Sequence, residues 1–217
     1  MLTRSTVSIA RELDEQERGA EAGVVGIRGT GWFLSPRLIV TAAHVAEAMH
    51  LSLRDWKDVD LQDANRGTAM AVRIQRVAGS HAEKIALLEL KEAFSGALVL
   101  QSRMDTLVAE ESVASLAYPG GRLRFAAGRF VKYGDEAAFT GTALLEMHDG
   151  NDRLVLDHGA SGAPVLDCDG RAVAVVSTII TQTINVLSRV VRVSTAWQTP
   201  NIVAIPIQAL KDFVRSD

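Results

Sequence analysis

The sequence predicts an all-β fold, and three observations support that prediction. Apolar residues make up 47% of the 217 residues and charged residues 23%, which is enough for a sizeable core. Short runs rich in Val, Ile, Leu and Ala are separated by turn signals among the 17 glycines, while aromatic residues contribute only 5%. Helical spacing is confined mainly to the two chain ends. We therefore expect about a dozen short strands and few helices.

The N-terminal segment is predicted to be helical. Val7, Ile9, Ala10 and Leu13 fall near one face between residues 3 and 20, with charged residues elsewhere. This pattern favours a short amphipathic helix that lies on the folded body. The alternative is an arm that docks on a partner. In either case residues 1–22 are expected to form a helical arm.

The segment from Thr30 to Glu47 organises the first half of the chain. It consists of Thr-Gly-Trp-Phe-Leu-Ser-Pro-Arg-Leu-Ile-Val-Thr-Ala-Ala-His-Val-Ala-Glu. After a first strand at residues 24–28, we predict a small-residue turn at residues 29–31, a strand ending at residues 33–34, a Ser-Pro turn, and a strand at residues 38–40. Small residues then carry His44 onto a short helical turn that ends near residue 50.

Further strands are predicted on both sides of a linker. The first half continues with a polar loop at residues 51–66 that brackets a strand, and residues 101–111 form the linker. In the second half, Asp169-Gly170 predicts a hairpin turn, with Cys168 as a structural turn residue. The remaining expected strands are 68–77, 85–90, 98–100, 112–118, 123–131, 143–147, 154–156, 165–176 (as a hairpin) and 202–207, with a closing helix at 208–215.

A second segment, Asp157 to Leu166, complements the first. It consists of Asp-His-Gly-Ala-Ser-Gly-Ala-Pro-Val-Leu, so Ser161 lies between glycines ahead of an apolar strand. A tight turn of this kind brings backbone N–H groups together. With His44, the segment offers a base, a nucleophile and an oxyanion site.

Together the two segments resemble the chymotrypsin-fold serine peptidases. The opening Gly-Thr-Gly-Trp-Phe-Leu-Ser-Pro, the absence of paired cysteines and the closing Asn201-Ile-Val-Ala-Ile-Pro-Ile are most similar to bacterial trypsin-like peptidases of the HtrA type. The resemblance implies two six-stranded Greek-key barrels with the site between them. It divides the chain into the arm, a first barrel at residues 23–105 with His44, and a second barrel at residues 106–217 with Ser161.

The resemblance also implies residue roles. Ser161 is expected to be the nucleophile and His44 its general base, with the N–H groups of Gly159 and Ser161 as the oxyanion hole. The floor of the primary pocket is expected near Val155, and its wall near Val176, Ser177 and Thr178. Because the floor has no carboxylate, we expect a small or medium apolar side chain there rather than Arg or Lys.

One position departs from the family pattern. Where these peptidases carry the catalytic aspartate, this chain has Lys84. An ammonium cannot accept the Nδ1–H of His44, and a nearby cation disfavours the imidazolium. Either Glu83 or an aspartate from residues 55–63 replaces the missing carboxylate, or the Ser161–His44 pair works slowly or under the control of a partner, or the chain is an inactive binding module.

The partners implied are a protein or peptide substrate and a separately encoded regulatory protein. Ala160 stands where zymogen-activated trypsins have an aspartate, so activation by N-terminal clipping is not expected. No peptide-binding domain is expected after Asp217, unlike in the HtrA peptidases. No cofactor is expected, and the five histidines and one cysteine lack the spacing of metal ligands.

Composition excludes two partner classes and suggests a compartment. A net charge of −3 is not that of a domain built to neutralise phosphates, so nucleic acid is not an expected partner. No apolar stretch approaches the roughly 18 residues of a membrane span. Cys168 has no partner for an intramolecular disulfide, which favours a reducing compartment and a cytoplasmic location.

Overall fold

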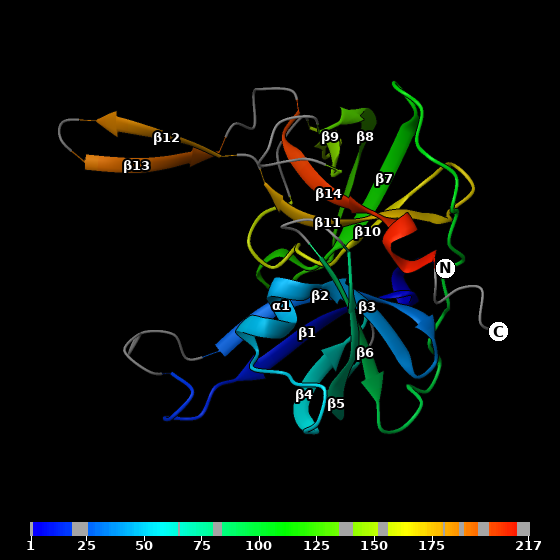
Figure 1. Cartoon of the computed structure of the whole chain (residues 1–217), viewed down its shortest axis with the longest axis vertical. Coiled ribbons are helices and arrows are strands. Elements are labelled where there is room, and N and C mark those ends of the chain that lie inside the picture. The colour runs from blue at the N-terminus through cyan, green and yellow to red at the C-terminus, as the bar shows by residue number, and fades with distance from the viewer. Residues whose placement is uncertain are drawn as a thin grey trace.

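The chain forms two closed antiparallel β-barrels that stack on one another (Figure 1). The structure is a computed structural model, and it describes residues 2–18, 26–64, 66–79, 84–134, 141–151, 156–179, 181–186, 189–194 and 200–211. The predicted all-β, two-barrel fold is confirmed.

The two barrels share one strand order. The first barrel runs β1-β2-β3-β6-β5-β4 and the second β7-β8-β9-β14-β11-β10, so the same six-strand arrangement occurs twice. The first barrel consists of β1 (Thr6–Glu12), β2 (Gly26–Ser35), β3 (Leu38–Ala42), β4 (Lys57–Gln62), β5 (Gly67–Ala78) and β6 (Ile85–Leu90). The second consists of β7 (Ser112–Ala117), β8 (Arg124–Tyr133), β9 (Ala143–His148), β10 (Pro164–Leu166), β11 (Ala172–Ile179) and β14 (Ile202–Pro206).

Four short helices and one hairpin complete the described elements. The helices are η1 (Leu2–Arg4), α1 (Ala43–Ala48), η2 (Pro119–Gly121) and η3 (Ile207–Leu210). The hairpin pairs β12 (Thr181–Val186) with β13 (Arg189–Ser194) and projects away from the second barrel (Figure 1). It was not predicted, although its strands are rich in β-branched residues.

The predicted N-terminal helix is wrong, because residues 6–12 form β1. Val7 and Ile9 alternate with Thr6 and Ser8, and both apolar side chains are fully buried in the core of the first barrel. Alternation with period two is the signal of a strand. Burial of both apolar side chains in the barrel stabilises the strand more than the weak helical spacing favours a helix. Because β1 pairs with β2 and β4, the first barrel begins before residue 23.

Two other details of the predicted first barrel are also wrong. Residues 98–100 form no strand, since β1 provides the sixth strand instead. Residues 29–31 form no turn, because β2 runs straight through them. A Cβ at Gly29 would lie 2.4 Å from Val45 Cγ1, and one at Gly31 would lie 2.5 Å from Ile39 Cγ2. These glycines therefore allow α1 and β3 to pack tightly against β2.

The contact between the barrels has its own apolar core. Trp32, Val40 and Leu87 of the first barrel pack with Val175 and Ile205 of the second, and all five are at least 95% buried. Leu210 of η3 joins the same cluster, so the described part of the predicted closing helix covers the junction; residues 212–215 of that prediction lie outside the described residues. This shared core fixes the two barrels relative to one another.

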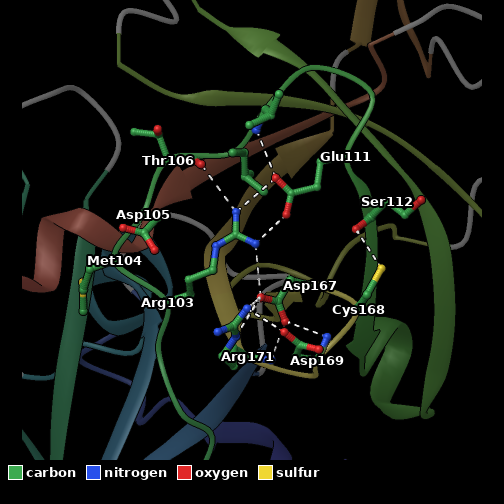
Figure 2. A network of polar contacts seen from close by, with 12 residues as sticks. Arg103, Met104, Asp105, Thr106, Glu111, Ser112, Asp167, Cys168, Asp169 and Arg171 are labelled. Carbon is green, nitrogen blue, oxygen red and sulfur yellow. Dashed lines mark hydrogen bonds and ion pairs between the residues drawn. The ribbon is translucent and has the colours of Figure 1, made fainter.

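The linker between the barrels is held by a network of charges (Figure 2). The Arg103 guanidinium donates to both oxygens of Glu111 and, at 3.2 Å, to Asp167 in the β10–β11 turn. Arg171 binds the same Asp167 carboxylate at 2.9 Å. Hydrogen bonds from Arg103 hold the pKa of Glu111 below its ordinary value. Burial alone would raise the pKa of Asp167, but the hydrogen bonds from Arg171 outweigh it and the pKa is lowered.

Candidate active site

His44 lies on the first turn of α1, at the edge of the first barrel. β3 ends at Ala42 and α1 begins at Ala43, so His44 is the second residue of the helix and lies directly after the end of the strand. The His44 side chain is exposed. The backbone N–H of Ala43 donates to the carbonyl oxygen of Lys84 at 2.8 Å, which ties the residue before β6 to the start of the helix. The backbone at position 84 therefore lies next to the start of the helix that carries His44, as the resemblance predicts.

The loop that carries Ser161 is held by its own backbone and by β11. Ala160 N–H donates to Asp157 O at 2.8 Å, and Gly162 N–H donates to Val176 O at 2.7 Å. Gly159 and Gly162 have φ angles of +95° and +93°, a region that other L-residues rarely adopt. A Cβ at Gly162 would lie 2.0 Å from the Thr30 carbonyl oxygen, so only glycine fits there.

Thr30 of β2 joins the two halves of the site. Its N–H donates to Ser161 O at 2.9 Å, and its hydroxyl donates to Gly159 O at 2.7 Å and accepts from Tyr118 N–H at 3.0 Å. Its carbonyl oxygen accepts from the Thr41 hydroxyl at 2.7 Å. Thr30 is fully buried. It thus connects the barrel of His44 to the loop of Ser161. Thr30 begins the predicted Thr30–Glu47 segment, but its sequence context gives no signal of this role.

The Ser161 hydroxyl is not free in this structure. It donates a hydrogen bond of 2.7 Å to the carbonyl oxygen of Ser177 in β11. Any reaction at this hydroxyl requires it first to leave that carbonyl and rotate. The Ser161 side chain is half-buried.

The geometry of the loop suits an oxyanion hole. Within the part of the chain that the structure describes, the N–H groups of Gly159 and Ser161 have no hydrogen-bond partner. A carbonyl oxygen that develops negative charge would find both donors unoccupied. The positive φ of Gly159 sets the direction of its peptide group, which explains the requirement for glycine at this position.

The predicted pocket residues are only partly described. Val155 lies outside the described residues, and so does the side chain of Thr178. Val176 and Ser177 follow one another on β11 directly beside the Ser161 loop, and both are buried. Their role as the wall of the primary pocket stays a prediction.

The replacement for the missing carboxylate also stays a prediction. Glu83 lies outside the described residues. Within the 55–63 segment, Asp55 accepts from the Ser52 hydroxyl at 3.0 Å, and Asp63 accepts from Arg66 N–H at 2.8 Å. Burial, together with the charge of Asp63, raises the pKa of Tyr118 to about 12. Asp55 and Asp63 thus have structural partners of their own.

No group of three or more His, Cys, Asp or Glu in the described ranges is arranged to hold a metal ion. Over the same ranges, no helix is long and apolar enough to cross a membrane.

Two barrels of this order, with a histidine on the first and a glycine-flanked serine on a loop of the second that is hydrogen-bonded to the first, are typical of the trypsin-like serine peptidases. The family described as "Trypsin-like peptidase domain" matches residues 29–175, more than half of the chain. The chain therefore belongs to this family, and it is a trypsin-like serine protease. Among curated protein sequences, none matches the chain.

Solved structures share the fold at low sequence identity. The Rv3671c protease of Mycobacterium tuberculosis in its active form is 17% identical, with a TM-score of 0.63 over 97% of this chain and 79% of that one. Its inactive form is 16% identical, with a TM-score of 0.61 over 97% and 87%. The HtrA-type protease AlgW with a tripeptide is 12% identical, with a TM-score of 0.62 over 99% of this chain but only 60% of that one.

Proposed function

We propose that the chain is an endopeptidase that forms an acyl-enzyme on Ser161 with His44 as general base. The observation that carries the proposal is the set of four hydrogen bonds through Thr30, which fixes the Ser161 loop against the barrel that bears His44. Catalytic groups held in this way react faster, because the entropy cost of bringing them together is met on folding and not at each turnover.

The reaction follows from the roles of these groups. Ser161 Oγ attacks the scissile carbonyl carbon as His44 takes its proton, and the oxyanion lies between the N–H groups of Gly159 and Ser161. The C–N bond breaks as His44 returns the proton to the leaving amine. Water then attacks the acyl-enzyme with His44 again as base, which releases the acid and restores the Ser161 hydroxyl.

We propose that Lys84 keeps the resting rate low. Without an orienting carboxylate, turnover in such enzymes falls roughly 10⁴-fold, or about 5.4 kcal/mol. A carboxylate supplied by Glu83, by the 55–63 segment or by a regulatory protein would raise the rate. The hydrogen bond from Ser161 to Ser177 also suits a resting state. Rv3671c, which shares this fold, has been solved in both an active and an inactive form.

For the substrate, we propose an apolar side chain on the acyl side of the cleaved bond. Val176 and Ser177 place small, uncharged groups beside the Ser161 loop. Such a pocket offers no carboxylate to pair with Arg or Lys. A cytoplasmic location, proposed from the single Cys168, would make cytoplasmic proteins the substrates.

The second candidate function is peptide binding without cleavage. The position of Lys84 favours it, because its backbone lies next to the start of α1 and an ammonium near His44 would oppose formation of the imidazolium. The cleft would then hold a peptide while Ser161 remains bound to Ser177.

One experiment separates the two functions. The protein is incubated with a denatured protein mixture, and new peptide N-termini are identified by mass spectrometry for the unmodified chain, for Ser161→Ala and for Ser95→Ala, which alters an exposed turn serine. The proposal predicts new termini that disappear only in Ser161→Ala. If no preparation generates new termini while peptides still bind, the second function is the correct one.

A further inference from the structure

A charged groove borders the oxyanion loop, and no residue of β11 lines it. It contains a cavity of about 480 Å³ whose lining includes Arg28, Asp60, Gly120, His158 and Gly159. A second cavity of about 400 Å³ adjoins it and shares Ala10, Arg28 and Asp60 with it. The groove therefore begins at the catalytic loop and continues across the first barrel.

The strand register explains the groove. Ala10 of β1 pairs with Arg28 of β2 on one side and with Asp60 of β4 on the other, so the three side chains lie in a row on the same face. The methyl group of Ala10 leaves a gap between the two charged side chains. Their Cα atoms are two strand spacings apart, roughly 10 Å.

Arg28 and Asp60 are available to a ligand. Both are exposed, and within the described ranges neither forms an ion pair or a hydrogen bond through its side chain. The other guanidinium at the groove, Arg11, already binds Glu17 at 2.8 Å and the Met49 carbonyl oxygen. Because Lys57 and Arg11 both bind Glu17, the pKa of that carboxyl falls to about 2. Glu17 is therefore ionised at neutral pH, and Arg11 stays bound to it.

The order of the two charges relative to the catalytic loop is fixed. Arg28 lies two residues before Thr30 on the same face of β2, and the Thr30 hydroxyl binds Gly159. The Arg28 guanidinium also lies against η2, since a Cβ at Gly121 would be 2.4 Å from its Nη1 atom. Asp60 lies two strands farther away. Moving outward from Gly159, a peptide therefore meets the cation first and the anion second.

We infer that this groove binds the leaving side of the substrate and selects an acidic side chain near the cleaved bond, followed by a basic one. The inference rests on the proposed function for its direction, because β11 is assigned to the acyl side and no residue of β11 lines the groove, which reaches the serine loop at His158 and Gly159. Arg28 pairs with the acid and Asp60 with the base. Residues i and i+2 of an extended peptide point the same way and lie roughly 6.7 Å apart. The long side chains of Arg28 and of a peptide Glu or Lys cover the difference from the roughly 10 Å between the Arg28 and Asp60 Cα atoms.

The test uses peptides of identical composition and opposite order. Each has a mixture of Ala, Val, Leu and Met on the acyl side, followed by Glu-Ala-Lys or by Lys-Ala-Glu, beginning at the first or the second residue after the bond. Total charge is the same in every peptide, so general electrostatic attraction cancels. The cleavage rate is measured for the unmodified chain and for Arg28→Glu combined with Asp60→Lys.

We expect the Glu-Ala-Lys order to be cleaved about fivefold to tenfold faster in at least one register, which is the effect of two partly exposed ion pairs. The double reversal should invert the ratio. A matched reversal of an exposed pair on another surface, Lys91→Glu with Glu92→Lys, should leave the ratio unchanged. A ratio near one in both registers, or a ratio unaffected by the reversal at residues 28 and 60, would overturn the inference.

If no peptide is cleaved, the same ratio is read as binding to Ser161→Ala by fluorescence anisotropy. An order preference in binding then supports the groove while counting against the proposed catalysis. Absence of binding, or equal binding of both orders, overturns the inference itself. The two proposals can therefore fail separately.

Discussion

Among single residues, Lys84 is the one expected to limit the activity of the proposed site. Lys84→Asp would place a carboxylate next to the start of α1, where it can accept the Nδ1–H of His44 and stabilise the imidazolium. We predict a rise in cleavage rate of at least 100-fold, toward the roughly 10⁴-fold that the carboxylate contributes in related sites.

The matched control is Lys84→Met, which removes the charge and keeps an unbranched side chain. It should give only a small gain, because no acceptor is added. An equal gain in both variants would show that the cation, and not the missing carboxylate, limits the rate. Steady-state kinetics on one cleaved peptide suffice for the comparison.

Glycine at position 162 is required for the serine loop to approach β2. Gly162→Ala combines a strained φ of +93° with a Cβ only 2.0 Å from a backbone oxygen, so we predict a loss of about 2–4 kcal/mol in the free energy of unfolding. Gly67→Ala is the control, because nothing lies within 4 Å of its added Cβ. Urea denaturation measures both; similar losses would contradict the packing described for the loop.

At the scale of elements, β2 is the strand that unites the site. Thr30→Val removes a buried hydroxyl that serves Gly159 and Tyr118, and leaves the Tyr118 N–H without an acceptor. We predict a loss of about 2–4 kcal/mol in unfolding free energy and a slower reaction at Ser161. Thr30→Ser keeps both hydrogen bonds and should lose much less. Stability close to that of the unmodified chain in Thr30→Val would refute this role.

Strands with a clear pattern were predictable from sequence, but their long-range pairing was not. Residues 85–90 and 143–147 are apolar except for one glutamate each, and they form β6 and β9 as expected. Residues 6–12 fit both a helical and a strand pattern of apolar residues. Only their pairing with β2 and β4 shows that they form a strand. Similarly, Gly29 and Gly31 signal a turn locally, whereas the packing of α1 and β3 requires glycine within a strand.

The same limit applies to the site. Motif spacing identified His44 and Ser161, because both lie in short, distinctive segments. Thr30 and Arg28 gain their roles from neighbours at least 88 residues away, among them Tyr118, Gly121 and Gly159. A sequence without aligned relatives carries no signal for such contacts.

At the scale of the whole molecule, the Arg103 network holds the linker against the second barrel (Figure 2). The pKa values of Glu111 and Asp167 are lowered in the folded chain, so their stabilisation is present above the ordinary values of 4.5 and 3.8 and is lost as pH falls through the folded values. Arg103→Gln should therefore cost about 1–3 kcal/mol at pH 7 and progressively less below about pH 4.5.

Arg124→Gln serves as the control, since it alters an exposed arginine on β8. It should change neither the stability at pH 7 nor its dependence on pH. Urea denaturation at several pH values gives both results. A cost for Arg103→Gln that stays constant down to pH 3 would show that the network does not act through these carboxylates.

The proposed function depends on the activation of Ser161 by His44. Intact-mass detection of covalent labelling by a fluorophosphonate tests this activation, because the reagent requires an activated serine and no knowledge of the substrate. We predict a single label on the unmodified chain, faster labelling in Lys84→Asp, and none in Ser161→Ala. If neither the unmodified chain nor Lys84→Asp is labelled, Ser161 and His44 do not form a catalytic pair.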